Sequence, residues 1–225
     1  MYKIAHRGLS GLYPENTLIA FEKALELDFK GIEFDVIRMR CGTLAVFHDY
    51  NTDRLLSVDV CINDLTLVDA NKLTLSGKKI PTLKDVLELI GNKKEIHLEI
   101  KDNDIYQLVA NELNEQIKNG LNPENIIVSS FFHKNVLKIK ELVKDIKTGC
   151  LIESVPITLS KVAMDCRADY LNVGLEFITK DLVEHAHSKG LKVLVWTVDK
   201  QRDFDKMKSI YVDGVFSNFF DLEIN

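Results

Sequence analysis

Two histidines and several carboxylates occur within the first fifty residues, each near the end of an apolar, strand-like run. The segments that contain them are His6-Arg7-Gly8, Glu33-Phe34-Asp35 and His48-Asp49. An imidazole has an unperturbed pKa of about 6.5, so one histidine can be basic and another acidic near neutral pH. A lone histidine at a strand end is more often structural, but two beside acids and an arginine favour catalysis. We therefore expect His6 and His48 to form a general acid/base pair suited to phosphodiester chemistry.

The carboxylates follow the period of a strand. Glu33 and Asp35 are two residues apart and share one face of their strand, and Glu99 likewise shares a face with Lys101. If both faces point into one barrel mouth, three carboxylates converge and would repel one another at neutral pH without a cation. A hard divalent ion, Mg²⁺ or Ca²⁺, binds oxygen ligands and removes this conflict, so we expect one such ion on Glu33, Asp35 and Glu99. The alternative is an inward salt-bridge layer in which Lys101 neutralises part of the charge.

Two cationic side chains are the expected partners of a phosphate group. They are Arg7 and Lys101, because a guanidinium offers a bidentate fork and an ammonium offers a point charge. Trp196 lies near the end of a later apolar run, where its indole could line a pocket or fill the top layer of a barrel. The sequence does not favour either position for Trp196, and the same two positions are open to Phe131.

Two further segments have structural interpretations. Asp49 could orient a neighbouring group, but a role in a turn is favoured. Residues 14–17, Pro-Glu-Asn-Thr, are interpreted as architectural, with Asn16 or Thr17 as the N-cap of a helix. Glu15 could nevertheless reach the mouth and hydrogen-bond one of the charged side chains there.

Short apolar strands alternate with amphipathic helices along nearly the whole chain, and these elements must position the residues above. The expected strands are 2–6, 31–37, 95–101, 126–131, 147–152, 170–174, 192–198 and 212–217. The expected helices are 17–28, 82–90, 105–119, 134–144, 157–165, 179–189 and 201–208. Strands joined by helical crossovers pair in parallel and form an open sheet or a closed barrel. Because no Gly-x-Gly-x-x-Gly turn follows a strand and the charged residues cluster at strand ends, we predict a (β/α)8 TIM barrel.

The stretch 43–80 interrupts this alternation. Residues 43–48 have a strand pattern that returns from 31–37 across the Cys41-Gly42 turn. Residues 50–80 lack a helix–strand period, which predicts a small insertion after strand two. The insertion is too short to be a separate domain, so one domain is expected over 1–225.

Composition excludes several classes of protein. The net charge of −5, without a run of Lys or Arg, argues against a nucleic-acid partner. No window reaches the roughly 18 consecutive apolar residues of a membrane span, and no signal-peptide pattern precedes the first motif. The four cysteines are far apart and form no Cys-x-x-Cys pair, so reduced thiols in a cytoplasmic protein are expected. The sequence gives no indication of the oligomeric state.

These motifs together resemble the glycerophosphodiester phosphodiesterase family, whose members are similar in fold to phosphatidylinositol-specific phospholipases C. The matching stretches, in family order over nearly the whole chain, are His6-Arg7-Gly8, Pro14-Glu15-Asn16-Thr17, Glu33-Phe34-Asp35-Val36, Phe47-His48-Asp49, Ile80-Pro81-Thr82-Leu83, Leu98-Glu99-Ile100-Lys101, Val195-Trp196-Thr197-Val198 and Asp213-Gly214-Val215. Two positions depart from the family pattern. The last strand runs into Asn218 without the usual proline, and His97 stands where a smaller polar residue is frequent. Neither is expected to touch the cluster of charged residues.

The resemblance implies a TIM-like barrel with an insertion after strand two and hydrolysis of glycerophosphodiesters, a small-molecule substrate, to glycerol 3-phosphate and an alcohol. The roles it implies are His6 and His48 in acid/base catalysis, Glu33, Asp35 and Glu99 on a divalent metal, and Arg7 and Lys101 on the phosphate. The short length resembles the cytoplasmic branch of the family. One alternative is a phospholipase D acting on lysophospholipids or sphingolipids, which should show an exposed apolar rim; no long apolar loop is evident. The other is a non-catalytic barrel that binds phosphate esters, which the complete set of expected catalytic residues disfavours.

Overall fold

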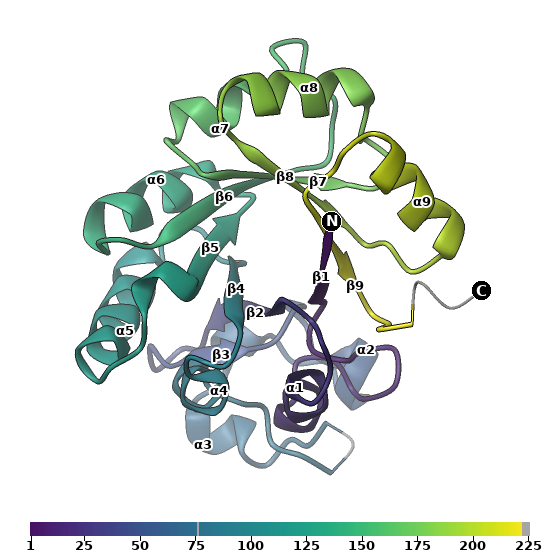
Figure 1. Ribbon diagram of the computed structural model, residues 1–225. Helices are drawn as coiled ribbons and strands as arrows, with labels where there is room; N and C mark the ends of the chain where they lie inside the picture. Colours follow the sequence, from purple (N-terminus) through teal and green to yellow (C-terminus); the bar gives the residue numbers. More distant parts are fainter. Residues whose placement is uncertain (76, 222–225) are drawn as a thin grey trace.

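Within residues 1–75 and 77–221, which the computed structural model describes, eight parallel strands form a closed barrel with helices around the outside (Figure 1). The strands of the barrel are β1 (Tyr2–Ala5), β2 (Gly31–Arg38), β4 (Glu95–Ile100), β5 (Ile126–Ser130), β6 (Lys147–Ile152), β7 (Tyr170–Gly174), β8 (Lys192–Trp196) and β9 (Gly214–Ser217). β1 pairs with β9 on one side and with β2 on the other, which closes the barrel. The predicted (β/α)8 barrel is confirmed.

The helices that cover the barrel begin and end close to their predicted positions. They are α1 (Leu18–Leu25), α4 (Leu83–Ile90), α5 (Tyr106–Lys118), α6 (His133–Leu142), α7 (Lys161–Asp165), α8 (Lys180–Ser188) and α9 (Gln201–Ser209), with a 3-10 turn η2 (Pro123–Asn125) before β5. Thr82 and Asp85 form the expected capping box at the start of α4. The helix predicted over 157–165 begins only at Lys161, because Leu159 has a φ of +51° and cannot continue a right-handed helix. None of the helices in the described part of the chain is long and apolar enough to cross a membrane.

Alternation along the strands separates the core from the site. In β2, Ile32, Phe34 and Val36 are buried in the hydrophobic layer between the barrel and the helices. Glu33 and Asp35 take the opposite face and therefore point into the barrel. A second apolar cluster lies on the inward faces of the strands and comprises Ile4, Ile127, Tyr170, Leu194 and Phe216. The barrel interior is thus packed below the carboxylates, which places them at the carboxyl ends of the strands.

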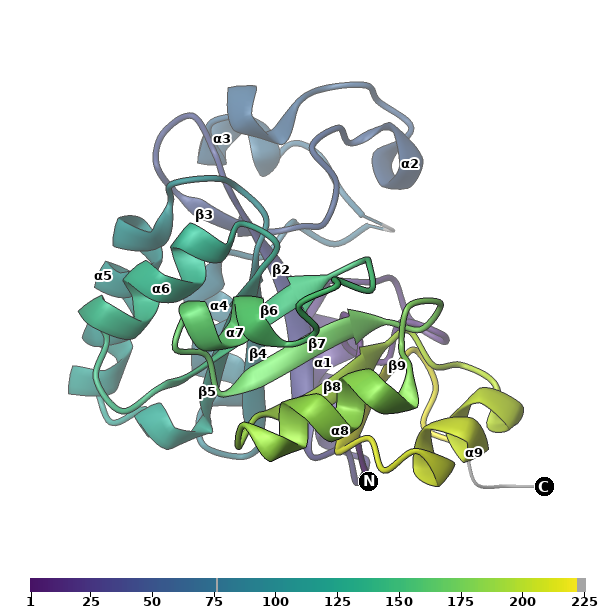
Figure 2. The same ribbon diagram turned by 90° about the horizontal axis from the view of Figure 1, so that it is seen from above.

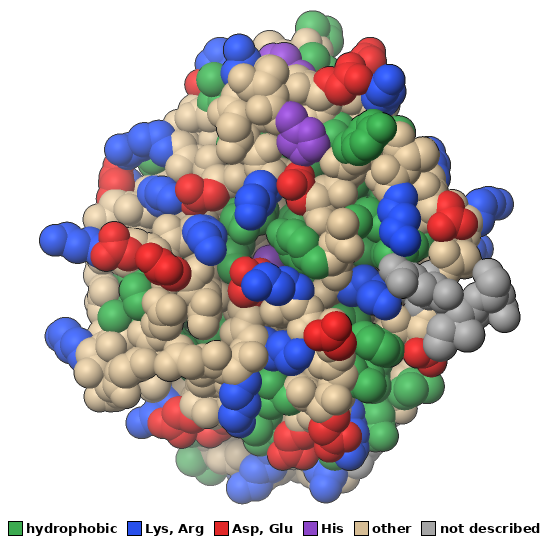
Figure 3. Space-filling view, viewed as in Figure 1, with side chains coloured by type: hydrophobic (Ala, Val, Ile, Leu, Met, Phe, Trp, Pro, Cys, Tyr) green, Lys and Arg blue, Asp and Glu red, His purple; other side chains and the backbone are tan. Residues whose placement is uncertain are grey.

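The segment after β2 forms a small extension at that end of the barrel. β3 (Leu44–Val46) pairs antiparallel with β2, as the strand pattern over 43–48 predicted. It is followed by α2 (Asp53–Leu56), η1 (Ile62–Asp64) and α3 (Leu67–Ala70), which lie beyond one end of the barrel in Figure 2. An apolar cluster that includes Met39, Phe47 and Ile62 holds the extension together. The opposite end of the barrel faces the viewer in Figure 3, and there Lys and Arg side chains are interspersed with Asp and Glu.

Candidate active site

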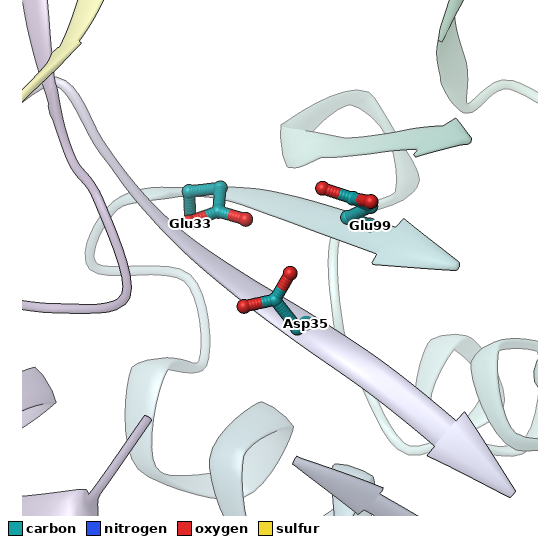
Figure 4. A group of neighbouring side chains, drawn as sticks. All are labelled: Glu33, Asp35 and Glu99. Carbon is teal, nitrogen blue, oxygen red and sulfur yellow. The ribbon is translucent and has the colours of Figure 1, made fainter. Parts of the chain in front are cut away.

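Three carboxylates converge on neighbouring strands β2 and β4, level with the end of β1 (Figure 4). Glu33 and Asp35 come from β2, and Glu99 comes from β4, where it is the register partner of Asp35. One oxygen from each of the three lies within 4.8 Å of the others. Glu33 is 6% exposed and Asp35 is 1% exposed, so their charges are held away from bulk water. The strand alternation inferred from the sequence correctly brought these three together.

Burial and mutual repulsion perturb the pKa values of this cluster. Burial and the neighbouring Asp35 carboxylate raise the pKa of Glu33 well above its usual value and raise that of Glu99 to about 7. Burial alone would also raise the pKa of Asp35, but the charges of Arg7 and Lys101 outweigh it and leave this pKa lowered. The three carboxyl groups therefore resist being ionised together, a conflict that a bound cation would relieve.

The donor set of the cluster fits a divalent metal ion. All of its groups are carboxylates, and hard cations such as Mg²⁺ and Ca²⁺ prefer oxygen ligands. The Oδ1 atom of Asp35 is buried and accepts no hydrogen bond from the described residues. The salt-bridge alternative is present as well, because Lys101 Nζ lies 2.8 Å from Glu99 Oε1 and 3.8 Å from Asp35 Oδ1. Lys101 thus neutralises part of the charge and leaves a cluster of carboxylates that could hold a metal.

Arg7 is held beside the cluster by its own backbone and by two acids. Its backbone N–H donates to Glu33 Oε2 at 2.9 Å, and its Nε lies 3.2 Å from Asp35 Oδ2. Its φ is +54°, a conformation that costs energy for a residue with a side chain. The next residue, Gly8, has a φ of +79°, and a Cβ there would lie 2.8 Å from the carbonyl carbon of Ala20. The turn therefore requires glycine and aims the Arg7 guanidinium into the site.

The segment 14–17 does more than the architectural role favoured by the sequence. Thr17 is the N-cap of α1, as expected, and its Oγ1 accepts from Ala20 N. Asn16, however, is 1% exposed and donates from Nδ2 to Asp35 Oδ2 at 2.9 Å, while the backbone N–H of Asp35 donates to Asn16 Oδ1. Its φ of +56° is one that asparagine tolerates better than most residues. The purely architectural interpretation was wrong, because Asn16 orients one of the clustered carboxylates.

His6 has a hydrogen-bond partner that fixes its tautomer. Its Nδ1 lies 2.8 Å from Asn218 Oδ1, and Asn218 Nδ2 donates to Asp199 Oδ2 at 2.6 Å. Since the amide of Asn218 donates to the carboxylate, its oxygen must accept from His6 Nδ1–H, which leaves Nε2 with a free lone pair. Burial and the positive charge of Arg7 lower the pKa of His6 to about 4. His6 is therefore a neutral imidazole whose Nε2 can accept a proton.

His48 is held by a carboxylate instead. Its Nδ1 lies 2.6 Å from Asp49 Oδ1, and Asp49 Oδ2 accepts from Arg54 Nε at 2.6 Å. Arg54, from α2, also pairs with Glu15, which in turn accepts from Arg7 Nη1 at 2.8 Å. The favoured assignment of Asp49 to a turn was wrong, because its side chain orients His48. Glu15 reaches the mouth, as the sequence allowed, and links the two arginines.

These residues surround one cavity of about 380 Å³ at the carboxyl ends of the strands. The sequence-predicted residues that line it are His6, Arg7, Glu33, His48, Glu99, Lys101 and Trp196, with Asp35 buried beside Glu33. Phe131 lines it too, so the two aromatic side chains face the pocket rather than only filling the barrel. The sequence-predicted histidines and charged groups lie on or just after β1, β2, β3 and β4, and the rest of the wall is formed by residues on or just after β5 to β9.

Three supporting residues were missed by the sequence analysis. Asn218, Asp199 and Arg54 have no motif spacing to His6 or His48, and their contacts depend on how distant loops meet. The one available signal was the absence of proline at Asn218. That departure was expected not to touch the charged cluster, and this was wrong, since Asn218 is the direct partner of His6. His97 is buried inside the barrel, where its Nε2 lies 3.5 Å from Glu95.

Comparison with known proteins gives similarities along nearly the whole chain. The sequence profile of the glycerophosphoryl diester phosphodiesterase family matches residues 6–222. A glycerophosphodiester phosphodiesterase of Caldanaerobacter subterraneus is 35% identical over 225 residues, which are 96% of this chain and 93% of that protein. A crystal structure of a Thermotoga maritima glycerophosphodiester phosphodiesterase has a TM-score of 0.81 at 31% identity and covers 100% of this chain and 96% of its own. An Oleispira antarctica phosphodiesterase, solved with its product sn-glycerol-3-phosphate, has a TM-score of 0.89 at 26% identity and covers 97% of this chain and 93% of its own.

Proposed function

The chain belongs to the glycerophosphoryl diester phosphodiesterase family, and from this premise we propose that it hydrolyses glycerophosphodiesters to glycerol 3-phosphate and an alcohol in a metal-dependent reaction. It is accordingly a phosphoric diester hydrolase. The observation that carries the finer proposal is the meeting of two histidines, three carboxylates and two cations around one cavity. The product bound to the Oleispira antarctica phosphodiesterase supports the same product here.

The proposed cofactor is one Mg²⁺ or Ca²⁺ ion held by Glu33, Asp35 and Glu99. When bound, it supplies positive charge that polarises a phosphoryl oxygen and stabilises the transition state. Arg7 and Lys101 face the same space, and they orient the phosphate through charge-assisted hydrogen bonds. Because Lys101 already pairs with Glu99, its ammonium stays near the carboxylates until a phosphate is present.

The proposed proton transfers follow from the different partners of the two histidines. His6 is neutral and donates from Nδ1 to an amide oxygen, so its Nε2 acts as the base that deprotonates the nucleophile. His48 donates from Nδ1 to the Asp49 carboxylate, which orients its ring, so its Nε2 is the group that protonates the departing alkoxide. The nucleophile is either the adjacent hydroxyl of the glycerol or a water molecule. A substrate analogue without that hydroxyl separates these routes, because only the route through water would leave its turnover unimpaired.

Hydrolysis of glycerophosphocholine tests the reaction and the metal together. Chelator-treated protein is incubated with the substrate, with and without added Mg²⁺ or Ca²⁺, and the released glycerol 3-phosphate is measured. We expect release only when a divalent ion is added and a loss of at least about 100-fold in Glu99→Gln. Release that survives chelation unchanged would refute the metal site, and no release with any ion would refute the reaction.

A change of leaving group tests the roles of the two histidines. The p-nitrophenyl ester of glycerol 3-phosphate releases a phenolate that needs no general acid. His48→Ala should therefore lose about 100-fold or more on glycerophosphocholine but much less on the activated ester, whereas His6→Ala should lose activity on both. The opposite pattern would exchange the two roles. Equal losses on both substrates in both variants would show that neither histidine protonates the leaving group.

A second candidate reaction is supported by apolar side chains near the mouth. Phe132 in the loop after β5 and Val155 and Ile157 in the loop after β6 are 40%, 48% and 102% exposed, although no long apolar loop was evident from the sequence. Such side chains could contact the acyl chain of a lysophospholipid, as a lysophospholipase D requires. Release of choline from lysophosphatidylcholine, compared with glycerophosphocholine, distinguishes the two. Faster turnover of the lyso-lipid would favour this candidate.

A further inference from the structure

The wall of the pocket opposite the carboxylate cluster carries a carboxylate of its own. Glu153 immediately follows the end of β6, and β6 lies across the eight-stranded barrel from β1, which leads into His6. Glu153 lines the same cavity as the charged residues, but it is exposed at the rim. It has no hydrogen bond or ion pair with the described residues. Its negative charge is therefore available to a bound molecule.

Two aromatic rings lie in the same wall. The rings of Phe131 and Trp196 are 5.8 Å apart, measured between centroids, and their planes are nearly perpendicular. Gly174, between β6 and β8, has no side chain to separate Glu153 from Trp196. A Cβ built on Gly174 would lie 3.2 Å from Phe177 Cδ2 and 3.7 Å both from Glu153 Cγ and from Trp196 Cζ2. The Glu153 side chain and the indole thus both approach the Gly174 backbone, with the Phe177 ring against the same position.

We propose that Glu153 and Trp196 form a subsite for the head group of the substrate, with Phe131 packed edge-on against the indole, and that this subsite prefers a positively charged ammonium head group. A carboxylate attracts the charge, and the indole accepts an alkylated ammonium against its face. The substrate phosphate is matched by Arg7, which follows the strand opposite β6, and by Lys101, whose Nζ lies 6.0 Å from the centroid of the Phe131 ring, so the two ends of a zwitterionic diester meet opposite charges. This inference rests on the proposed function.

The depth of the polar groups decides which part of the diester faces Glu153. Asn172 is 1% exposed and lines the pocket, and neither polar atom of its side-chain amide has a hydrogen-bond partner among the described residues. The buried Nε1 atom of Trp196 is likewise unpaired within the described chain. Neutral donors and acceptors at this depth suit the hydroxyl groups of glycerol. Glu153, which is charged and exposed, therefore contacts the head group, and the head group points toward solvent.

The test compares kcat/KM for three substrates that differ only in the head group: glycerophosphocholine, glycerophosphoethanolamine and glycerophosphoglycerol. The wild-type protein should prefer the two cationic substrates, and this preference should weaken as the salt concentration rises. Glu153→Gln should lower kcat/KM for the cationic substrates about five-fold, the size expected of one partly exposed ion pair, and leave glycerophosphoglycerol unchanged. The matched control is Glu176→Gln, which removes the same charge from the exposed loop after β7 without touching the pocket. It should alter none of the three.

Three outcomes overturn the subsite. An equal loss on all three substrates in Glu153→Gln would mean that Glu153 binds the glycerol, and no loss on any would mean that it binds nothing. Gly174→Ala fills the space between Glu153 and Trp196 and should reduce turnover of the choline ester more than that of the glycerol ester; an equal reduction contradicts the subsite. If none of the three is hydrolysed, the proposed function fails separately. In that case calorimetry tests the subsite by itself. The affinity for phosphocholine, relative to the affinity for inorganic phosphate, should fall in Glu153→Gln but not in Glu176→Gln.

Discussion

Acidification should destabilise this protein through His6. Burial and the neighbouring Arg7 guanidinium lower the pKa of its imidazole to about 4 in the folded state, whereas an unfolded histidine titrates near about 6.5. Between these values the unfolded chain binds a proton that the folded chain does not, so the free energy of unfolding falls as the pH falls. The two pKa values correspond to roughly 3 kcal/mol in total, of which about 2 kcal/mol is lost between about pH 7.5 and pH 5.

The measurement is urea denaturation of the metal-free wild-type protein and of His6→Gln at these two pH values. The carboxylate cluster also titrates in this range, but it is present in both proteins, so the comparison isolates the histidine. The variant should lose about 2 kcal/mol less than the wild type on acidification, because it cannot bind the proton when it unfolds. Parallel losses in the two proteins would show that the pKa of His6 is not lowered and would remove the basis for its role as a base.

Three further predictions concern the support of the site. Asn16→Ala should lower the free energy of unfolding, measured in urea, by about 3 kcal/mol. The substitution removes a buried hydrogen bond to the Asp35 carboxylate and leaves alanine at a φ of +56°. A loss under about 0.5 kcal/mol would contradict this role. Gly8→Ala should cost more than Gly42→Ala by at least about 2 kcal/mol, because both glycines have positive φ but only Gly8 lies against a neighbouring backbone; equal losses would show that strain alone matters. Adding Ca²⁺ or Mg²⁺ at about 100 times its Kd should raise the free energy of unfolding by about 2.7 kcal/mol, and Glu99→Gln should abolish most of this gain; a gain of the same size in the variant would place the ion elsewhere.

The sequence determined the barrel and the carboxylate cluster because both depend on short periods. Alternation of strands and helices specified parallel pairing, and the two-residue period placed Glu33 and Asp35 on the inner face of β2. The carboxyl ends of parallel strands lie at the same end of the barrel, so residues there are close together regardless of the loop conformations. The same period places Glu99 of β4 beside Asp35, its register partner.

Assignments that depended on loop conformation could not be made in this way. The helix over 157–165 looked continuous, but a single positive φ at Leu159 delays its start. The turn assignment of Asp49 failed because the sequence does not specify side-chain orientation in a loop, even toward the adjacent His48, and residues 14–17 meet Asp35 only in the tertiary structure.

Tertiary structure alone decided how the two histidines differ. Asn218 lies 212 residues from His6 in the chain, and it meets that ring only because β9 closes the barrel against β1. Arg54 reaches Asp49 and Glu15 from the short helix of the insertion. A histidine's pKa depends on burial and on its neighbours, which local sequence periods do not specify. The residue types and their period therefore fixed which groups gather at the mouth, while tertiary contacts fixed their orientation and lowered the pKa of His6.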